Sequence, residues 1–212
     1  MRIIGGKWKG HSLSTPKPAG QRVQQTRPAI QKVRQVRPVR QVRPVRQVRP
    51  SASRTREALF SILTASPQIE FANARVRDLF AGVGTLGFEA LSRGAAYCVF
   101  VEQEASVCKI LHRNRALLQA QNKSAVLCRD ARRLGTCKDL PCQLIFADPP
   151  YGKGLAEKAL ASALRGGWFG AGAHIIVEED KRASFTPPAG LTFYDRRQYG
   201  DTALIFLTCD AP

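Results

Sequence analysis

The 212-residue sequence has no apolar run of about eighteen residues, the length that a membrane-spanning helix needs. Its opening, MRIIGGKWKG, also lacks the apolar segment of a secretory signal. The six cysteines include no C-x-x-C pair, and Cys137 and Cys142 have no second pair or histidine cluster nearby to complete a zinc site. These absences predict a soluble, cytoplasmic protein with reduced, mostly buried thiols, no metal site and no membrane partner.

Acidic residues are missing from the first 56 positions, which hold 15 of the 33 Lys and Arg and none of the 16 Asp and Glu. The net charge of +17 therefore belongs mainly to this segment, and residues 57–212 are close to neutral. Such a field attracts polyanions by releasing their counterions, so RNA, DNA or an acidic membrane surface are the candidate partners. A solubilising tail is the alternative, which the complete lack of acid makes less favoured.

Residues 33–50 are three perfect copies of Val-Arg-Gln-Val-Arg-Pro. A proline every six residues removes backbone donors and excludes a regular helix, so this segment should be extended or disordered. It is too short to form a solenoid, and it is either a basic insert that orders on an anionic partner or a repeat expansion without a role. We divide the chain into a basic N-terminal extension, residues 1–56, which contains this insert, and a folded domain, residues 57–212.

Periodicity predicts the elements around the insert. Gly5 and Gly6 lie between residues 2–4 and 8–13 and indicate a short hairpin or a curled edge strand. Ser53 fits the N-cap of a helix that reaches residue 63 and ends before Pro67.

From residue 75 onward, short apolar runs alternate with helical patterns. The expected strands are 76–80, 97–101, 125–128, 144–147 and 174–177, and the expected helices are 84–92, 105–118 and 155–164. This order predicts an α/β fold with an open, mostly parallel sheet and helices on both faces. Two further runs, 192–199 and 202–207, predict a terminal antiparallel pair.

The first expected strand of that sheet leads into a Gly-x-Gly-x-x-Gly pattern made by Gly82, Gly84 and Gly87, and Glu102 follows twenty residues after the first glycine. The glycines let a ligand approach the backbone, and the acid can bind two ribose hydroxyls of an adenosine. A nicotinamide dinucleotide and S-adenosylmethionine fit this pattern about equally. A tight turn without a ligand is the alternative reading.

Asp78 favours S-adenosylmethionine, because a carboxylate before the loop would face a pyrophosphate but could bind the cationic methionine end directly or through water. Asp130 follows the third expected strand, where the adenine amino group would lie, although an exposed loop aspartate is commonplace. The full predicted cofactor site is Asp78, Phe80, Ala81, Gly82, Gly84, Leu86, Gly87, Glu102, Gln103, Asp130 and Ala131.

The run 144–147 ends in Asp148, Pro149, Pro150 and Tyr151, our predicted catalytic residues, at the sheet edge where open α/β folds bind ligands. The Asp148 carboxylate and the Pro149 carbonyl can accept hydrogen bonds from one amino group, and Tyr151 can stack on a base. An exocyclic amine is a poor nucleophile because its lone pair is delocalised into the ring. Two acceptors would localise that lone pair for attack on a sulfonium methyl, without a strong base or a metal. A rigid turn is the alternative reading.

These residues resemble the bacterial 16S rRNA guanine-N2 methyltransferases, a family of class I S-adenosylmethionine-dependent enzymes. The resemblance covers nearly the whole chain and rests on the opening ten residues and on segments 54–60 (RTREALF), 78–82 (DLFAG), 148–151 (DPPY) and 199–202 (YGDT). The glycine loop and Asp-Pro-Pro-Tyr alone would not separate this family from DNA adenine methyltransferases, whereas the opening and closing segments do.

The resemblance implies a Rossmann-like, seven-stranded sheet whose last pair is antiparallel, with S-adenosylmethionine as the cofactor. It also implies methylation of one guanine N2 in 16S rRNA, in a partly assembled small subunit, by a protein that we expect to be a monomer. The basic residues expected to bind phosphates are Arg2, Lys7, Lys9, Arg27, Arg49, Arg54 and Arg56.

One departure from the family is the segment before the Arg-rich helix. The family passes from an Arg-Pro pair into this helix within a few residues, whereas here Arg27-Pro28 and Arg49-Pro50 both qualify. Three competing functions stay open at this stage. They are a DNA adenine-N6 or other nucleic-acid amino-methyltransferase, a nicotinamide-dependent oxidoreductase, and an RNA-binding ribosome assembly factor without activity.

Overall fold

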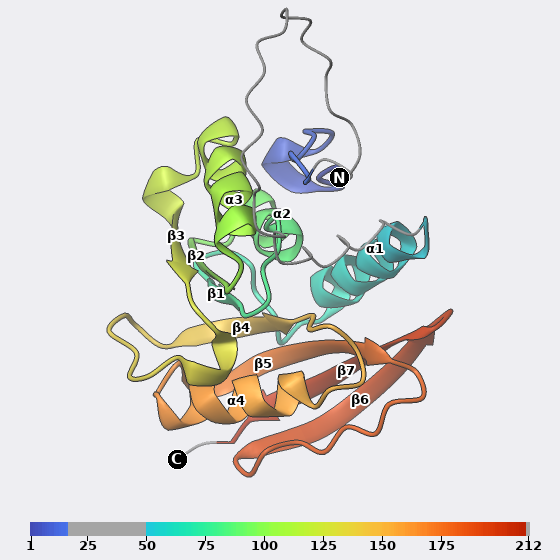
Figure 1. Ribbon diagram of the computed structural model, residues 1–212. Helices are drawn as coiled ribbons and strands as arrows, with labels where there is room; N and C mark the ends of the chain where they lie inside the picture. Colours follow the sequence, from blue (N-terminus) through green and yellow to red (C-terminus); the bar gives the residue numbers. More distant parts are fainter. Residues whose placement is uncertain (17–49, 211–212) are drawn as a thin grey trace, which may run out of the picture.

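The computed structural model describes residues 1–16 and 50–210, and its centre is a seven-stranded sheet in the order β3-β2-β1-β4-β5-β7-β6 (Figure 1). The strands are β1 Arg75–Asp78, β2 Tyr97–Glu102, β3 Ser124–Cys128, β4 Cys142–Ala147, β5 Phe169–Asp180, β6 Leu191–Tyr199 and β7 Thr202–Cys209. The pairings from β3 to β5 are parallel, and β7 is antiparallel to both of its neighbours. The predicted mostly parallel sheet with a terminal antiparallel pair is confirmed.

Helices cover both faces of this sheet. They are α1 Pro50–Ala65, α2 Thr85–Ser92, α3 Ala105–Leu117 and α4 Leu155–Arg165, with short 3-10 helices η1 Gly6–Trp8, η2 Gln121–Lys123 and η3 Ala131–Arg133. The first three α-helices and the N-terminal segment share one apolar core with the sheet, and α4 and η3 share the other (Figure 1). In the described part of the chain, no helix is both long and apolar enough to cross a membrane.

The central strands are apolar on both sides because both faces are covered. In β4, for example, Leu144 and Phe146 belong to the first core, whereas Ile145 and Ala147 belong to the second. Successive side chains of a strand point to opposite faces, so a strand covered on both sides is a continuous apolar run. This is why the strand positions could be predicted from short runs alone.

The chain reverses its direction of travel across the sheet between β1 and β4. It passes from β1 through β2 to β3 on one side and then returns to β4 on the other side of β1. Beyond the end of β1, Leu79 N donates to Phe146 O at 2.9 Å, and Ala81 N donates to Val101 O at 2.9 Å. The loop after β1 therefore lies between the carboxyl ends of β4 and β2, the switch point at which such sheets bind ligands.

The N-terminal segment, residues 1–16, forms the curled hairpin that the sequence predicts. Leu13 N donates to Met1 O at 2.7 Å, Arg2 and Ser12 form an antiparallel bridge, and the bend between the arms is η1. The arms stay short because two backbone donors bond to side chains of α2 and not to carbonyls of the hairpin. Trp8 N donates to Ser92 Oγ and Ile4 N donates to Glu89 Oε2, both at 2.8 Å.

Several boundaries differ from the sequence prediction. Helix α1 begins at Pro50 rather than after Ser53, since proline lacks a donor and suits the first position of a helix. The same helix continues without a break through residue 56, where we had placed the boundary of the extension. Strand β5 is much longer than the expected 174–177. Residues 17–49, which include Arg27, Arg49 and nearly all of the repeat, lie outside the described residues.

The cysteines are all free thiols. Four of them, Cys98, Cys108, Cys142 and Cys209, are buried, as predicted, and Cys128 is exposed. No cluster of three or more His, Cys, Asp or Glu within residues 1–16 and 50–210 could hold a metal ion.

Candidate functional site

The glycine loop between β1 and α2 needs glycine for two reasons. Gly82 and Gly84 have φ values of +53° and +90°, in the left-handed region that favours glycine. A Cβ at Gly82 would meet open space, whereas a Cβ at Gly84 would lie 2.4 Å from the Phe88 ring. Gly82 thus leaves room for a ligand against the backbone, while Gly84 lets α2 pack closely.

Asp78, the last residue of β1, lies beneath this loop and is only 1% exposed. Its Oδ2 accepts a hydrogen bond from Gly87 N at 3.0 Å. Burial raises the pKa of Asp78 to about 7, which the hydrogen bond from Gly87 opposes. Asp78 therefore ties the start of α2 to the strand. A contact with the methionine end of a cofactor stays a prediction.

Glu102, at the end of β2, connects the same loop to the neighbouring strand. Its Oε2 accepts from Gly82 N at 2.9 Å, and its Oε1 accepts from Glu104 N at 2.8 Å. Each carboxylate oxygen has two lone pairs, so both oxygens can accept a further hydrogen bond. The half-buried Glu102 and the exposed Gln103 lie where we predicted a ribose contact.

Asp130 follows β3 and caps η3. Its Oδ1 accepts from Arg132 N at 2.9 Å, and its carboxylate forms an ion pair with the Arg132 guanidinium. The hydrogen bond from Arg132 lowers the pKa of Asp130, although partial burial opposes this. The next residue, Ala131, is buried. A contact between Asp130 and an adenine amino group stays a prediction.

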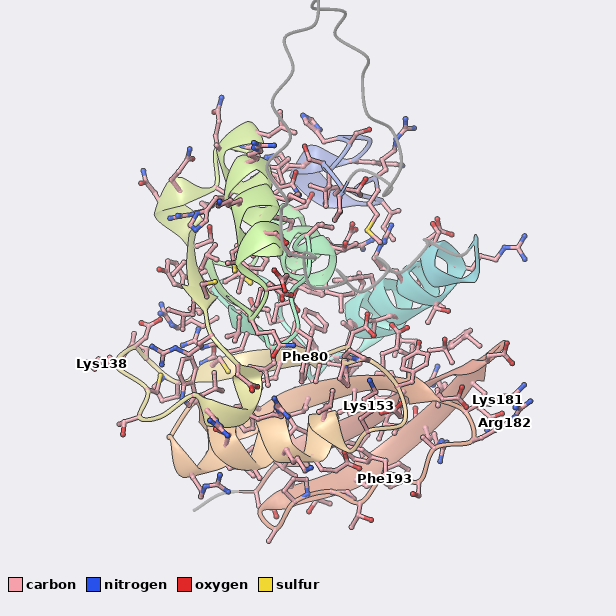
Figure 2. The ribbon with its side chains drawn as sticks, in the orientation of Figure 1. Phe80, Lys138, Lys153, Lys181, Arg182 and Phe193 are labelled. Atoms are coloured by element: carbon pink, nitrogen blue, oxygen red, sulfur yellow. The ribbon has the colours of Figure 1, made fainter. Side chains whose placement is uncertain are left out.

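The remaining predicted cofactor residues lie around the loop. Phe80 and Leu86 are half-buried, and Ala81 is buried. Figure 2 shows Phe80 near the middle of the molecule, above β4. These side chains provide apolar surface next to the open space at Gly82.

The Asp-Pro-Pro-Tyr segment leaves the carboxyl end of β4. Asp148 and Tyr151 are half-buried, Pro149 is buried and Pro150 is exposed. Tyr151 OH donates to Glu178 Oε1 at 2.7 Å and shares a 3.2 Å hydrogen bond with Thr202 Oγ1. Burial and the Glu178 carboxylate raise the pKa of Tyr151 above its ordinary value, so the phenol stays protonated. Two strands, β5 and β7, thereby fix the orientation of this ring.

A second acid of β5 holds the next residue of the loop. Gly152 N donates to Glu179 Oε1 at 3.0 Å, and the same oxygen accepts from Asp180 N at 3.0 Å. Glu178, Glu179 and Thr202 support the site but were not predicted from the sequence. The available signal was a run of acids directly after a buried apolar segment.

The predicted phosphate-binding residues fall into two groups. Arg2, Lys7, Lys9 and Arg54 are exposed. Arg56 is only 8% exposed, and its Nη2 donates to Arg2 O at 3.0 Å. Desolvation lowers the pKa of Arg56, although Glu89 and Glu178 oppose this. Because Arg56 lies on the buried face of α1, it links this helix to the N-terminal segment, and the phosphate contact predicted for it stays a prediction.

The N-terminal segment reaches the glycine loop itself. Thr85 Oγ1, at the first residue of α2, donates to Met1 Sδ at 2.8 Å. Asn114 Nδ2 on α3 donates to Ser14 O at 3.1 Å and to Val83 O at 2.9 Å. Met1 and Ser14 are therefore held at the carboxyl edge of the sheet, whereas Lys7 and Lys9 flank Trp8, whose backbone N donates to Ser92, the last residue of α2.

Comparisons with known proteins agree with this geometry. The sequence profile of the family described as "Conserved hypothetical protein 95" matches residues 39–208. Ribosomal RNA small subunit methyltransferase D of Escherichia coli K12 is 32% identical over 204 residues, which cover 96% of this chain and 87% of its own. The Buchnera aphidicola protein of the same name is 32% identical over 147 residues, 69% of this chain and 75% of its own. The chain belongs to the conserved hypothetical protein 95 family.

A solved structure supports the same assignment. "Putative methyltransferase yhhF" from Escherichia coli matches with a TM-score of 0.74 at 29% identity, covering 100% of this chain and 99% of its own. The family match takes in the helices and strands from α1 to β7, and therefore every element that carries the site. The predicted enzyme class is confirmed, and the chain is a methyltransferase of this family.

Proposed function

We propose that this methyltransferase transfers the methyl group of S-adenosylmethionine to N2 of a guanine in 16S rRNA, within a partly assembled small ribosomal subunit. The observation that carries the proposal is the juxtaposition of Asp78, Glu102 and Asp148. They lie at the carboxyl ends of β1, β2 and β4, which are adjacent in the order β2-β1-β4. The relatives named for small-subunit rRNA methylation favour this substrate.

The residues of the site fit S-adenosylmethionine. The open space at Gly82 admits a ligand against the backbone, and the lone pairs of Glu102 suit ribose hydroxyls. Asp78 and Glu102 place two carboxyl groups at this edge, which suits a cationic sulfonium and disfavours the pyrophosphate of a dinucleotide. When bound, the cofactor supplies an electrophilic methyl group.

Asp148 and Pro149 would hold the guanine amine in this proposal. The carboxylate and the carbonyl accept its two hydrogens, which localises the nitrogen lone pair, and Tyr151 stacks on the base. Glu178 and Thr202 keep the Tyr151 ring in place through its hydroxyl. The proton leaves the nitrogen after transfer, so the site needs only acceptors.

The exposed cations near the N-terminus would bind phosphates of the RNA. Arg2, Lys7 and Lys9 lie on the segment that contacts the start of α2, and Arg54 is exposed on α1. Arg27 and Arg49 are outside the described residues, and their phosphate contacts stay predictions. Since residues of one chain supply the whole site, we propose that the enzyme acts as a monomer.

The test is methyl transfer to small ribosomal subunits from cells that lack the activity. Labelled S-adenosylmethionine is the donor, and mass spectrometry identifies the modified nucleoside. We expect N2-methylguanosine in 16S rRNA. N6-methyladenine in DNA would replace the proposal with the amino-methyltransferase alternative, and RNA binding without turnover would indicate an assembly factor. Binding of a nicotinamide dinucleotide in place of S-adenosylmethionine would indicate an oxidoreductase.

The Asp148→Ala variant tests the assigned mechanism. We expect methyl transfer to fall by about 10²–10³-fold, because one of two preorganised acceptors is lost, while S-adenosylmethionine still binds. The matched control is Asp195→Ala on β6, whose carboxylate pairs with Arg197 on the surface and should leave transfer unchanged. A fully active Asp148→Ala enzyme would contradict the mechanism.

A further inference from the structure

A shallow basic groove lies between η3 and α4, on the face of the sheet opposite to α1, α2 and α3. Its volume is about 310 Å³, and its lining residues are Arg132, Arg133, Lys158, Ala161 and Arg165. None of these residues belongs to the predicted cofactor, catalytic or RNA-binding sets.

The helix periodicity brings these side chains together. Lys158, Ala161 and Arg165 are spaced by three and four residues, so they share one face of α4. The opposite, apolar face packs on the sheet, and Leu134 N donates to Ser162 Oγ at 3.0 Å, which fixes the segment after η3 along the helix. The small Ala161 lies between longer cations and leaves the surface concave.

The groove concentrates positive charge in a domain that is otherwise nearly neutral. It has four cations and no acid in its lining. Arg132 pairs with Asp130, whereas Arg133, Lys158 and Arg165 take part in no ion pair with the residues that the structure describes. Glu157 precedes Lys158 on α4 but does not line the groove. Three exposed cations are therefore available to an external anion.

The groove begins close to the active site. Its η3 wall starts at Arg132, two residues after Asp130, and its α4 wall starts at Lys158, seven residues after Tyr151. The N-terminal segment with its exposed cations packs in the other apolar core. Exposed cations thus lie on both faces of the sheet.

We propose that the basic groove binds the phosphate backbone of the RNA substrate, so that RNA crossing the carboxyl edge is held on both faces of the sheet. This inference rests on the proposed function and adds a second contact surface to it. Unpaired cations around a shallow depression suit phosphates, which are bound through charge and counterion release. A folded protein partner would find only Ala161 as an apolar contact, whereas protein interfaces depend on buried aromatic or aliphatic anchors.

The experiment compares two triple variants that lose the same charge. The groove variant carries Arg133→Gln, Lys158→Gln and Arg165→Gln. The control carries Lys109→Gln, Arg113→Gln and Lys123→Gln, all exposed on α3 and η2. Binding of the full-length enzyme to transcribed 16S rRNA is measured over a series of salt concentrations. We expect the groove variant to bind about 10–100-fold more weakly, with a log–log salt slope lower by roughly 2. The control should stay within about threefold of the wild type.

Each contrary outcome identifies its own error. Equal losses of RNA affinity in both variants would show an effect of net charge alone. Unchanged affinity of the groove variant would show that the groove does not bind RNA. A loss on small subunits but not on naked RNA would assign the groove to a ribosomal protein. All three would overturn the proposal. Loss of RNA affinity in the groove variant, with no methylation by the wild type, would reject the proposed function and keep the groove. S-adenosylmethionine affinity, measured by calorimetry, confirms that both variants are folded.

Discussion

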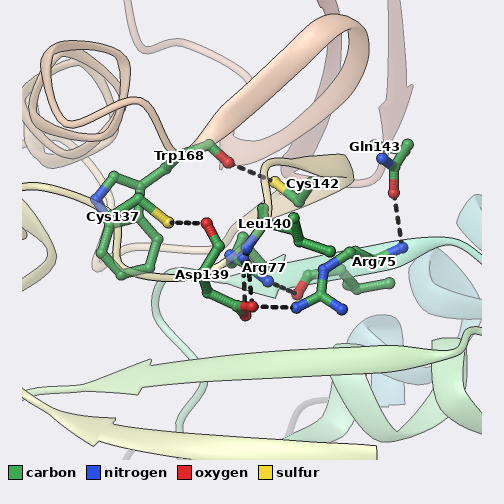
Figure 3. A network of polar contacts seen from close by, with 9 residues as sticks. Arg75, Arg77, Cys137, Asp139, Leu140, Cys142, Gln143 and Trp168 are labelled. Atoms are coloured by element: carbon green, nitrogen blue, oxygen red, sulfur yellow. Dashed lines mark hydrogen bonds and ion pairs between the residues drawn. The ribbon is translucent and has the colours of Figure 1, made fainter.

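The two edges of the sheet both carry charged residues, but they use them differently. At the carboxyl edge, Asp78 and Glu102 accept hydrogen bonds from the backbone of a glycine loop that borders open space. Arg77 directly precedes Asp78 on β1, but its fully buried side chain extends toward the amino edge, where it donates to Leu140 O at 2.7 Å and lies over the Trp168 ring at 5.7 Å (Figure 3). A buried charge therefore does not by itself mark a functional site.

The partners of the charges separate the two edges. In the amino-edge network, Asp139 pairs with both Arg75 and Arg77, and Cys142 Sγ donates to Trp168 O at 3.1 Å (Figure 3). The one carboxylate offsets part of the charge of the two arginines there, which is the pairing that a buried charge in a structural network requires. Within residues 1–16 and 50–210, no arginine or lysine forms an ion pair with the buried carboxyl group of Asp78, whose pKa burial raises. The carboxyl edge should therefore control activity, and the amino edge should control stability.

The largest expected effect belongs to the amino edge. Replacing Arg77 by Ala leaves a cavity under Trp168 and removes the donor to Leu140 O, so it should lower the free energy of unfolding by roughly 3–5 kcal/mol. Urea unfolding measures the loss. Arg77→Met keeps most of the side-chain volume and should lower the free energy of unfolding less. Arg75→Ala removes a partly exposed ion pair and should lower it by less than about 1 kcal/mol. If the folded Arg77→Ala protein bound S-adenosylmethionine more weakly, the amino edge would also affect cofactor binding, and the distinction between the two edges would be wrong.

The next effect is a pH dependence that Asp78 should impose on stability. Its folded pKa, about 7, is above the ordinary value of 3.8, so the folded state binds the proton more tightly. The contribution of Asp78 to the free energy of unfolding is then fully present below about pH 4. It declines as the pH rises to about 7, by about 4 kcal/mol at most. Urea midpoints from pH 4 to 8 should decline in the wild type relative to Asp78→Asn, which keeps an acceptor for Gly87 N. If the urea midpoints of the two proteins changed in parallel with pH, burial would not raise the pKa of Asp78.

The fold could be predicted from the sequence because both faces of the sheet are covered. Strands buried on two sides are short apolar runs, and the glycines and prolines between them mark their ends. Two predicted boundaries, the starts of β5 and of α1, were wrong because a glycine or a proline lies inside the element or at its first residue. Gly170 and Gly172 interrupt the start of β5, so the run from 174 looked like the whole strand. Pro50 looked like the end of an irregular repeat, whereas it suits the first position of α1.

The candidate site could be predicted only where its residues follow strand ends. Glu102 and Asp148 each follow an apolar run, and Asp78 precedes the glycine loop, so the sheet order brings the three together. Glu178 and Thr202 reach Tyr151 because β5 pairs with β7 in antiparallel register, a contact between segments distant in the sequence. Local patterns hold no information on that register, which the core packing of the finished sheet sets.

A smaller effect should come from Glu102. Its carboxylate contacts the backbone at Gly82 and, in the proposed function, the cofactor ribose. Glu102→Gln keeps the shape but removes the charge that strengthens these hydrogen bonds, so the Kd for S-adenosylmethionine should rise by about 10–100-fold. Calorimetry measures the Kd directly. Glu104→Gln, at the exposed N-cap of α3, is the matched control and should change it by less than about threefold. Equal changes would indicate a general effect of negative charge at this edge.

The smallest expected effect concerns the support of the Tyr151 ring. Tyr151→Phe keeps the stacking surface but loses the hydrogen bonds to Glu178 and Thr202, each worth about 1 kcal/mol. We expect kcat to fall by about 5–10-fold with an unchanged Kd for S-adenosylmethionine, because the ring becomes less well oriented without losing contact. Glu178→Ala should behave similarly, and the double variant should lose little more than either one, since both changes remove the same interaction. Glu178→Gln retains an acceptor and should restore most of the activity. If Tyr151→Phe were fully active while Glu178→Ala was impaired, Glu178 would act through Arg56, whose charge it also faces, and not through the ring.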